Sequence, residues 1–355
     1  MQEPQFLLQD EAIVAFSCFH APFIYNFIFS TLARHSRMNS QCHSLGSSGS
    51  HGHNGHHIRH ASHAGSWYSD NAKELDRQLG AWLDQAGPMV GGAARAVITP
   101  HAGYTYCGDT AAFAFKQVVP DKIKRIFVLG PSHVVYLGGC ALTTCSKYRT
   151  PLVDLAVDTD INNELMAAHE FEWMGLKNEE AEHSIEMQMP FIAKIMEKRP
   201  EGSYKIVPVL VGSLSTSRQT SYGKVFAKYI ADPQNLFVIS SDFCHWGNRF
   251  RYTPNDPSSG RAIHEQIATL DQRGMDAICA MDPPIFNDYL KKTQNTICGR
   301  NPICVMLQAA EHFRQMNNHT AEMRFLRYSQ SNKCRVLDDS SVSYAAGVLY
   351  INPKM

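Results

Sequence analysis

The stretch NLFVISSDFCHWG, residues 235–247, decides the fold. It begins with an apolar run rich in β-branched and aromatic side chains, which is typical of a strand buried on both faces. Three similar runs precede it in the chain: AVIT, RIFVLG and KIVPVLVG, residues 96–99, 125–130 and 205–212. Because segments with helical periodicity separate the runs, the pattern predicts an α/β fold. We expect a single domain with a mixed, largely parallel sheet that helices cover on both faces.

Histidines follow three of these predicted strands. His101 comes directly after the first strand, His133 after the second, and Asp242 and His245 after the fourth. In open α/β sheets, ligands bind outside the carboxyl ends of the strands, so the three histidines should meet in one crevice. Imidazole suits a metal ion or proton transfer there. Taken singly, each histidine could instead be a turn or core residue bonded to the backbone.

Two further motifs add candidate residues. AEHSIEMQMP, residues 181–190, places His183 and Glu186 one helical turn apart. That spacing suits a metal site, an oriented pair of imidazole and carboxylate, or a network at a helix start. In NTICGRNPI, residues 295–303, Cys298 precedes a turn and the predicted start of a helix. Such a position favours the thiolate, which binds metals, although a buried inert cysteine is the plain alternative.

Composition excludes several classes of function. The 355-residue chain has 33 Lys+Arg and 33 Asp+Glu, so its formal net charge is zero. Nucleic-acid surfaces and polybasic membrane patches need a clustered excess of positive charge, so neither partner is expected. The ten cysteines include no CxxC pair, which favours a reducing compartment, the cytoplasm.

The first 60 residues differ in character from the rest. Residues 12–33 are apolar and aromatic, but polar residues and a proline interrupt them and no basic region precedes them. We therefore expect no stable membrane span. Residues 40–60, rich in Ser, Gly and His, are typical of a disordered linker, with a weak metal-gathering role as the alternative. The predicted division is an extension at 1–60 and an α/β domain at 61–355.

Seven separated motifs occur in order: SHAGSWY, PHAGYTYCG, GPSH, EHSIEM, SSDFCHWG, NTICGRNP and DSSVSYAAG. Over residues 61–351 the chain resembles the Memo family (mediator of cell motility). That family is similar in turn to class III extradiol dioxygenases, mixed α/β proteins that hold non-haem iron with two histidines and a carboxylate. The resemblance implies that His101 and His133 are metal ligands and that His245, with Asp242 beside it, is the acid–base group.

The same resemblance implies that Cys298 stands at the third ligand position, where the dioxygenases have a carboxylate. Oxygen activation on Fe(II) relies on a hard carboxylate and open positions, so a thiolate disfavours extradiol dioxygenase turnover. Two imidazoles and a thiolate suit copper and can also hold iron or zinc. The resemblance implies a cytoplasmic copper- or iron-binding protein in redox and cell-motility signalling that controls reactive oxygen species. A metal-dependent oxidase would use the same ligands. His183 and Glu186 would lie next to the metal ligands and orient them without binding the ion.

Two other functions stay open. The resemblance implies a surface for phosphotyrosine peptides at the same pocket, to which Trp67, Tyr106, Arg249 and Arg251 would contribute. Arginine can bind a phosphate through two parallel hydrogen bonds, and aromatic side chains can stack on the ring of a phosphotyrosine. These properties favour a non-catalytic adaptor. Surface arginines and core aromatics are the plain alternative. The expected partners are signalling proteins: receptor tails with phosphotyrosine, small GTPase or oxidase systems. The third function is a non-haem iron dioxygenase.

Overall fold

The computed structural model describes residues 57–167, 170–316 and 319–353, which belong to one compact unit. The predicted apolar segment and most of the predicted linker rich in Ser, Gly and His lie outside these residues. Within the described ranges, no helix is both long and apolar enough to cross a membrane.

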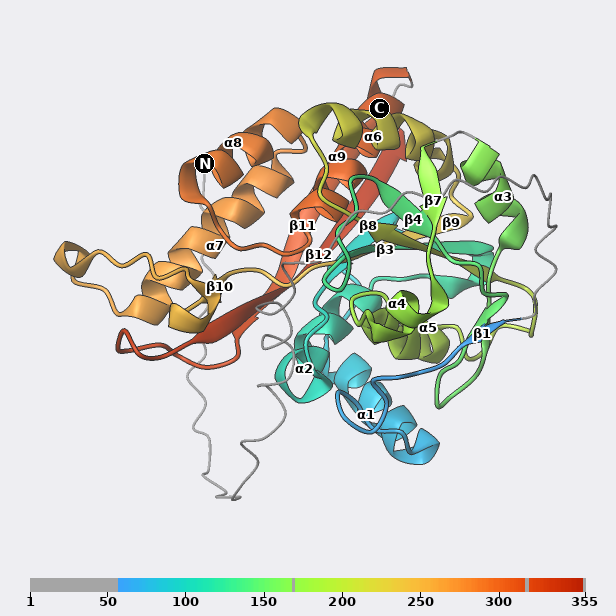
Figure 1. Ribbon diagram of the computed structural model, residues 1–355, viewed down its shortest axis with the longest axis horizontal. Helices are drawn as coiled ribbons and strands as arrows, with labels where there is room; N and C mark the ends of the chain where they lie inside the picture. The colour runs from blue at the N-terminus through green and yellow to red at the C-terminus, as the bar shows by residue number, and fades with distance from the viewer. Residues whose placement is uncertain (1–56, 168–169, 317–318, 354–355) are drawn as a thin grey trace, which may run out of the picture. The chain divides into compact units, whose positions relative to one another are not determined.

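Four parallel strands form the centre of the main sheet, in the spatial order β2–β9–β3–β8 (Figure 1). They are β2 (Ala96–Thr99), β9 (Asn235–Ser240), β3 (Arg125–Pro131) and β8 (Lys205–Val211). All four coincide with the apolar runs in the sequence. The predicted single-domain, mixed and largely parallel α/β fold is confirmed for the described residues.

Other strands extend this sheet on both sides. Next to β8, β4 (Cys140–Leu142) is antiparallel, and β7 (Phe171–Trp173) pairs with β4. Next to β2, β12 (Ser341–Pro353) runs antiparallel and also pairs with β10 (His245–Trp246) and β11 (His319–Gln330). A separate small sheet contains β1 (Ile58–Arg59), β5 (Lys147–Tyr148) and β6 (Leu155–Ala156).

Helices cover both faces of the main sheet (Figure 1). One face carries α1 (Ala72–Gln85), α2 (Tyr104–Phe115) and α5 (Met189–Ile195). The other carries α3 (Thr159–Ala167), α6 (Thr216–Ala231), α7 (Ile263–Cys279), α8 (Pro283–Thr293) and α9 (Arg300–Met316). The short helices are α4 (Leu176–Ala181), η1 (Pro120–Lys122), η2 (Glu186–Gln188), η3 (Asn248–Phe250) and η4 (Pro257–Ser259).

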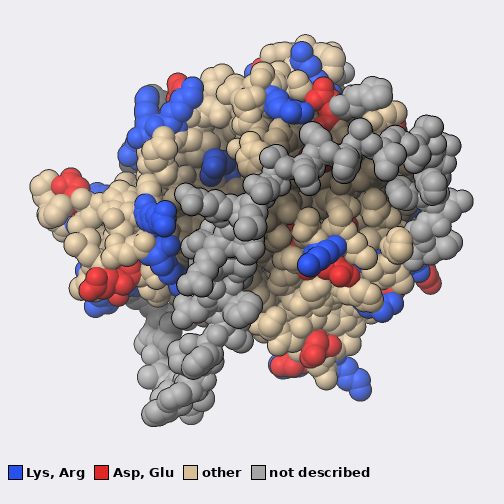
Figure 2. Space-filling model, in the orientation of Figure 1, with Lys and Arg blue, Asp and Glu red and all other residues tan. Residues whose placement is uncertain are grey.

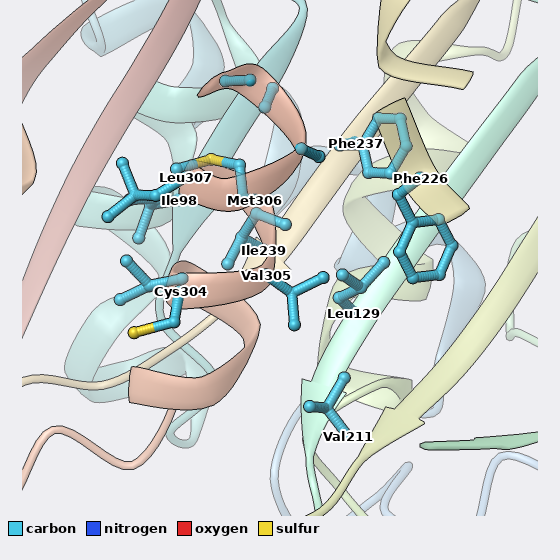
Figure 3. Close-up of a cluster of buried hydrophobic side chains, with 14 of the residues drawn as sticks. Ile98, Leu129, Val211, Phe226, Phe237, Ile239, Cys304, Val305, Met306 and Leu307 are labelled. Atoms are coloured by element: carbon cyan, nitrogen blue, oxygen red, sulfur yellow. The ribbon is translucent and has the colours of Figure 1, made fainter. Parts of the chain in front are cut away.

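The central strands supply side chains to two hydrophobic cores. On β9, Phe237 and Ile239 pack in the cluster that contains residues of α6 and α9 (Figure 3). Leu236 and Val238 alternate with these two residues along the strand and therefore pack in the cluster on the other face of the sheet. Burial of each such side chain stabilises the fold by roughly 1.5–3 kcal/mol. The two cores therefore hold the carboxyl end of β9 in a fixed place.

Charged side chains are scattered over the face shown in Figure 2, where blue and red groups lie among larger tan areas. No single sign of charge dominates that face. The arrangement agrees with the zero net charge of the chain.

The folded unit begins before the predicted boundary at residue 61. Strand β1 pairs with β5, and the Arg59 side chain is 1% exposed. Its guanidinium forms an ion pair with Glu186 and donates hydrogen bonds to the carbonyl oxygens of Glu179 and Glu182, at 3.1 and 2.9 Å. A buried arginine needs such partners because an unpaired buried charge is very costly. Arg59 thus ties the start of the domain to the segment that follows α4.

We expect Arg59→Met to lower the free energy of unfolding by about 3–5 kcal/mol, because it leaves the buried Glu186 carboxylate without its cation. Urea unfolding of the metal-free protein measures this. Arg149→Met is the matched control, since its ion pair with Asp154 is largely exposed and should contribute less than about 1 kcal/mol. Equal losses for the two variants would contradict the role assigned to Arg59.

A second buried polar group joins two loops beside the sheet. The Asp271 carboxylate, fully buried on α7, accepts hydrogen bonds from the Cys244 backbone N–H and from Asn295 Nδ2, at 3.2 and 2.9 Å. It also accepts one from the Tyr328 hydroxyl at 2.8 Å. Burial raises the pKa of Asp271 to about 6, although these hydrogen bonds oppose the change. Asp271 therefore fixes the loop after β9 against the loop after α8.

The raised pKa of Asp271 predicts how stability changes with pH. The folded protein retains this proton up to about pH 6, whereas the unfolded chain releases it near pH 3.8. Between these values the folded state binds more protons, so the contribution of Asp271 to stability falls as pH rises. Asp271→Asn should remove that fall in the free energy of unfolding. Asp276→Asn, at an exposed position of α7, should keep it; an unchanged slope in Asp271→Asn would refute the prediction.

Candidate functional site

The site lies where three neighbouring strands end. β9 runs between β2 and β3, so the residues after these strands reach the same edge of the sheet. His101 follows β2 and His133 follows β3, and their ring centroids are 5.2 Å apart. Asp242 follows β9 and accepts a hydrogen bond from the His101 backbone N–H at 2.8 Å. The structure thus brings together the residues that the strand ends predict.

A third imidazole belongs to the same group. His183 lies between α4 and η2, and its ring centroid is 4.5 Å from that of His133 and 5.4 Å from that of His101. One nitrogen from each of the three rings lies within 4.8 Å of the others, and such a group can hold a metal ion. The sequence placed His183 in a supporting role, whereas the structure places it among the candidate ligands.

Hydrogen bonds fix the orientation of the His101 and His133 rings, and the His183 ring lies close to a carboxylate. His101 Nδ1 is 2.7 Å from Ser240 Oγ, whose own hydrogen is donated to the Ser184 carbonyl, so Nδ1 is the donor. His133 Nδ1 is 3.0 Å from Glu182 Oε1, and His183 Nδ1 is 3.5 Å from the same oxygen. With Nδ1 occupied in this way, Nε2 of His101 and of His133 is left for a metal. An acceptor behind a histidine is the usual arrangement around metal ligands.

The thiol of Cys298 completes the donor set. Its Sγ is 3.2 Å from His101 Nε2 and accepts a hydrogen bond from the Asp242 backbone N–H at 3.3 Å. Burial raises the pKa of Cys298, but His101 and His133 lower it more, to about 6. The side chain is therefore largely thiolate at neutral pH, which is the form that binds metals.

The glycine after Cys298 allows this close approach. A Cβ atom at Gly299 would stand 2.3 Å from Cβ of Ser241, a separation that real structures do not show. Because glycine lacks Cβ, the turn before α9 can lie against the end of β9. The sequence pair Cys298–Gly299 thus brings the thiol to the histidines.

His245 lies three residues after Asp242, and its ring is held at one of the two nitrogens. Its Nδ1 is 2.9 Å from the Phe243 carbonyl oxygen and 3.1 Å from that of Thr296, so Nδ1 carries the proton. Burial lowers the pKa of His245, although Asp242 acts in the opposite direction. The neutral ring leaves a lone pair on Nε2, as an acid–base group requires. Asp242 is nearly fully buried, and its burial raises its pKa.

The four residues assigned to peptide binding lie in different surroundings. The Trp67 ring borders the imidazole group, with its centroid 4.6 Å from that of His183. Arg249 lies over the Phe250 ring on η3, and that ring is 5.2 Å from the His245 ring. Tyr106, in the first turn of α2, is 60% exposed, and Arg251 follows η3 at an exposed position.

Sequence reasoning missed the carboxylate that positions His133. Glu182 is 2% exposed and accepts from the His133 backbone N–H as well as from its ring. Glu186, for which pairing with His183 was one of three interpretations, accepts from His63 Nδ1 at 2.7 Å and from the Tyr68 hydroxyl at 2.8 Å. The sequence feature that could have pointed to Glu182 is its position directly before His183 in the motif AEHSIEMQMP. Its partner, however, is 49 residues away in the chain.

Comparison with known proteins identifies the family. Residues 59–348 match the Memo-like protein family. The chain is 65% identical over 290 residues to "Protein memo-1 homolog" of Caenorhabditis elegans, and the match covers 82% of each chain. It is 55% identical to "Protein MEMO1" of Xenopus laevis and 53% identical to that of Homo sapiens, over 81% of this chain and 96% of each relative. The chain therefore belongs to the Memo-like protein family.

Proposed function

We propose that this chain binds copper or iron and acts in redox and cell-motility signalling in the cytoplasm, where it limits the formation of reactive oxygen species. His101, His133 and Cys298 are the ligands of the proposed site. The proposal rests on one observation: a nitrogen of His101 and a nitrogen of His133 lie within 4.8 Å of each other, and the Cys298 sulfur is 3.2 Å from His101 Nε2. The family supports the signalling part of the proposal.

The chemistry of the donors favours a redox metal. Imidazole suits copper, iron and zinc, and a thiolate selects softer ions such as Cu(I). A bound copper or iron ion would supply one-electron chemistry at the site. His245 would accept or donate protons at Nε2, and Asp242 would hold the His101 backbone in place through the hydrogen bond at its N–H. These roles also suit a metal-dependent oxidase.

A non-haem iron dioxygenase is less well supported. That chemistry uses two histidines and a carboxylate on Fe(II), with positions open to oxygen and substrate. In this chain the donor next to His101 Nε2 is the Cys298 sulfur at 3.2 Å, while Asp242 Oδ2 is 4.0 Å away. The nearer thiolate favours a softer ion than the dioxygenase reaction needs.

The second candidate function is an adaptor that binds phosphotyrosine peptides of receptor tails. It is favoured by the contact of Trp67 with His183 and by the position of Arg249 beside the Phe250 ring that packs on His245. An aromatic ring and an arginine would then both stand near the histidines of the site. Signalling proteins, including small GTPase or oxidase systems, are the proposed partners in either function.

Metal analysis of the full chain purified without chelators separates the two functions. We expect copper or iron close to one ion per chain, and a strong loss of that metal in Cys298→Ser, His101→Ala and His133→Ala, because each change removes a ligand. His60→Gln is the control for the exposed histidines near the start of the domain. Metal-free protein that still binds a phosphotyrosine peptide would support the adaptor instead.

Glu182→Gln tests how the histidines are held. In the wild-type chain the two carboxylate oxygens of Glu182 accept hydrogen bonds from the backbone N–H and from the ring of His133. The glutamine side chain has one uncharged oxygen and can keep only one of these bonds, so metal affinity should fall about 10–100-fold. Glu180→Gln, two residues earlier and half-buried, should leave the affinity unchanged, because its carboxylate binds the His60 backbone N–H and not a histidine ring. Competition titrations with a chromophoric chelator measure both affinities. An unchanged affinity in Glu182→Gln would show that His133 is not a ligand or is held by other contacts.

A further inference from the structure

We propose that Thr253 is a phosphorylation site for a Ser/Thr kinase that requires proline after the acceptor residue, and that Arg249 and Arg251 bind the new phosphate. Thr253 lies in the loop between η3 and α7. The inference does not depend on a bound metal.

Exposure selects this residue among the candidates in the sequence. The chain has a Thr–Pro pair at Thr99, Thr150 and Thr253, and it has no Ser–Pro pair. Thr99 lies in β2 and is 0% exposed. Thr150 is 6% exposed, and its hydroxyl donates a hydrogen bond to the Val153 carbonyl at 2.8 Å. Thr253, in contrast, begins a run of exposed residues, 253–262, which a kinase can reach.

The backbone is held on both sides of Thr253. The Tyr252 carbonyl accepts a hydrogen bond from the Gly247 N–H at 2.8 Å. The Pro254 carbonyl accepts one from Trp246 Nε1 at 3.0 Å. These bonds tie the start of the loop to the end of β10, and η3 lies between the bonded segments. A phosphate on Thr253 would therefore form next to η3.

Two exposed arginines are close to Thr253 in this turn. Arg249 belongs to η3, and Arg251 ends it with a left-handed backbone, φ 54° and ψ 35°. A phosphate carries a charge of about −1.5 to −2 and accepts paired hydrogen bonds from guanidinium groups. The next carboxylate along the loop, Asp256, accepts from the N–H and the hydroxyl of Ser258, at 2.9 and 2.6 Å. That carboxylate therefore serves the start of η4.

The modification is an ordinary phosphoryl transfer, in which the kinase supplies Mg²⁺ and ATP. The hydroxyl oxygen of Thr253 forms a bond to the γ-phosphorus while the bond from that phosphorus to ADP breaks. The hydroxyl proton passes to a carboxylate of the kinase, and ADP leaves. A neutral side chain is thus replaced by a phosphate ester with a charge close to −2.

Phosphorylation would change what the surface beside His245 can bind. Arg249 lies over the Phe250 ring, and the centroid of that ring is 5.2 Å from the centroid of the His245 ring. A phosphate on the same chain that binds Arg249 and Arg251 competes with the phosphate of a peptide. This consequence rests on the proposed adaptor function, and it makes Thr253 a switch that weakens peptide binding.

Kinase treatment of the folded full chain, followed by mass spectrometry, tests the acceptor. The kinase is one that requires proline at the next position and that phosphorylates a synthetic peptide of residues 247–259. We expect stoichiometric phosphate at Thr253 and its complete loss in Thr253→Val. Pro254→Ala should also abolish the modification, because alanine keeps the backbone carbonyl that binds Trp246 but removes the proline that the kinase reads.

Two results would overturn the assignment of the acceptor. One is a folded chain whose Thr253 stays unmodified although the peptide is phosphorylated. The other is modification of Thr99 or Thr150 as fast as that of Thr253, because both residues are buried and would react only in unfolded molecules. Thermal unfolding of each variant checks that its fold is intact.

A ³¹P NMR titration of the phosphorylated full chain tests the two arginines. Guanidinium groups stabilise the dianion, so they should hold the pKa of the phosphate below its usual value of about 6. Arg249→Gln and Arg251→Gln should each shift this pKa upward. Arg261→Gln is the control, since this exposed arginine donates to the Thr269 hydroxyl at 3.2 Å. If all three variants titrate as the wild type, the arginines do not bind the phosphate.

Peptide binding separates this inference from the adaptor function. The probe is a fluorescent peptide with one phosphotyrosine between glycines, and its affinity should fall about tenfold when Thr253 is phosphorylated. Thr253→Val treated with the same kinase should keep the affinity. If the unmodified chain does not bind the probe, the adaptor function is wrong and the modification site stands. If binding is equal before and after phosphorylation, the switch is wrong.

Discussion

The site depends on one constraint: a histidine can direct Nε2 at an ion only if something holds its Nδ1. Ser240 holds His101 and Glu182 holds His133, and both of these acceptors are themselves buried. Ser240 is the last residue of β9, so the central sheet fixes His101 directly. Glu182 lies in a connection between short helices, which offers no such rigidity, and its position depends on further contacts.

Arg59 supplies those contacts from the beginning of the domain. It is bonded to the backbone of Glu179 and Glu182 and paired with Glu186, which in turn binds His63 and Tyr68. On the opposite side, Asp271 joins the loops that carry His245 and Cys298. Two buried polar networks, one on each side of the site, therefore place donors that come from distant parts of the sequence.

Sequence reasoning identified the parts of this arrangement that follow from strand ends. Apolar runs mark β2, β3, β8 and β9 because parallel strands are buried on both faces, and residues after such strands must gather at one edge. His183 could not be placed in this way, since it follows a short helix rather than a strand. Glu182 and Arg59 were missed because their partners are 49 and 127 residues away, and no local periodicity records such pairs.

X-ray absorption at the metal edge of the copper- or iron-loaded full chain tests the central claim most directly. It reports the atoms bound to the ion without any assumption about activity or partners. The account predicts imidazole nitrogen and one sulfur around the ion, with the sulfur contribution absent in Cys298→Ser. A coordination sphere made only of oxygen and nitrogen in the wild-type chain would contradict it, because the thiolate would then lie outside the site.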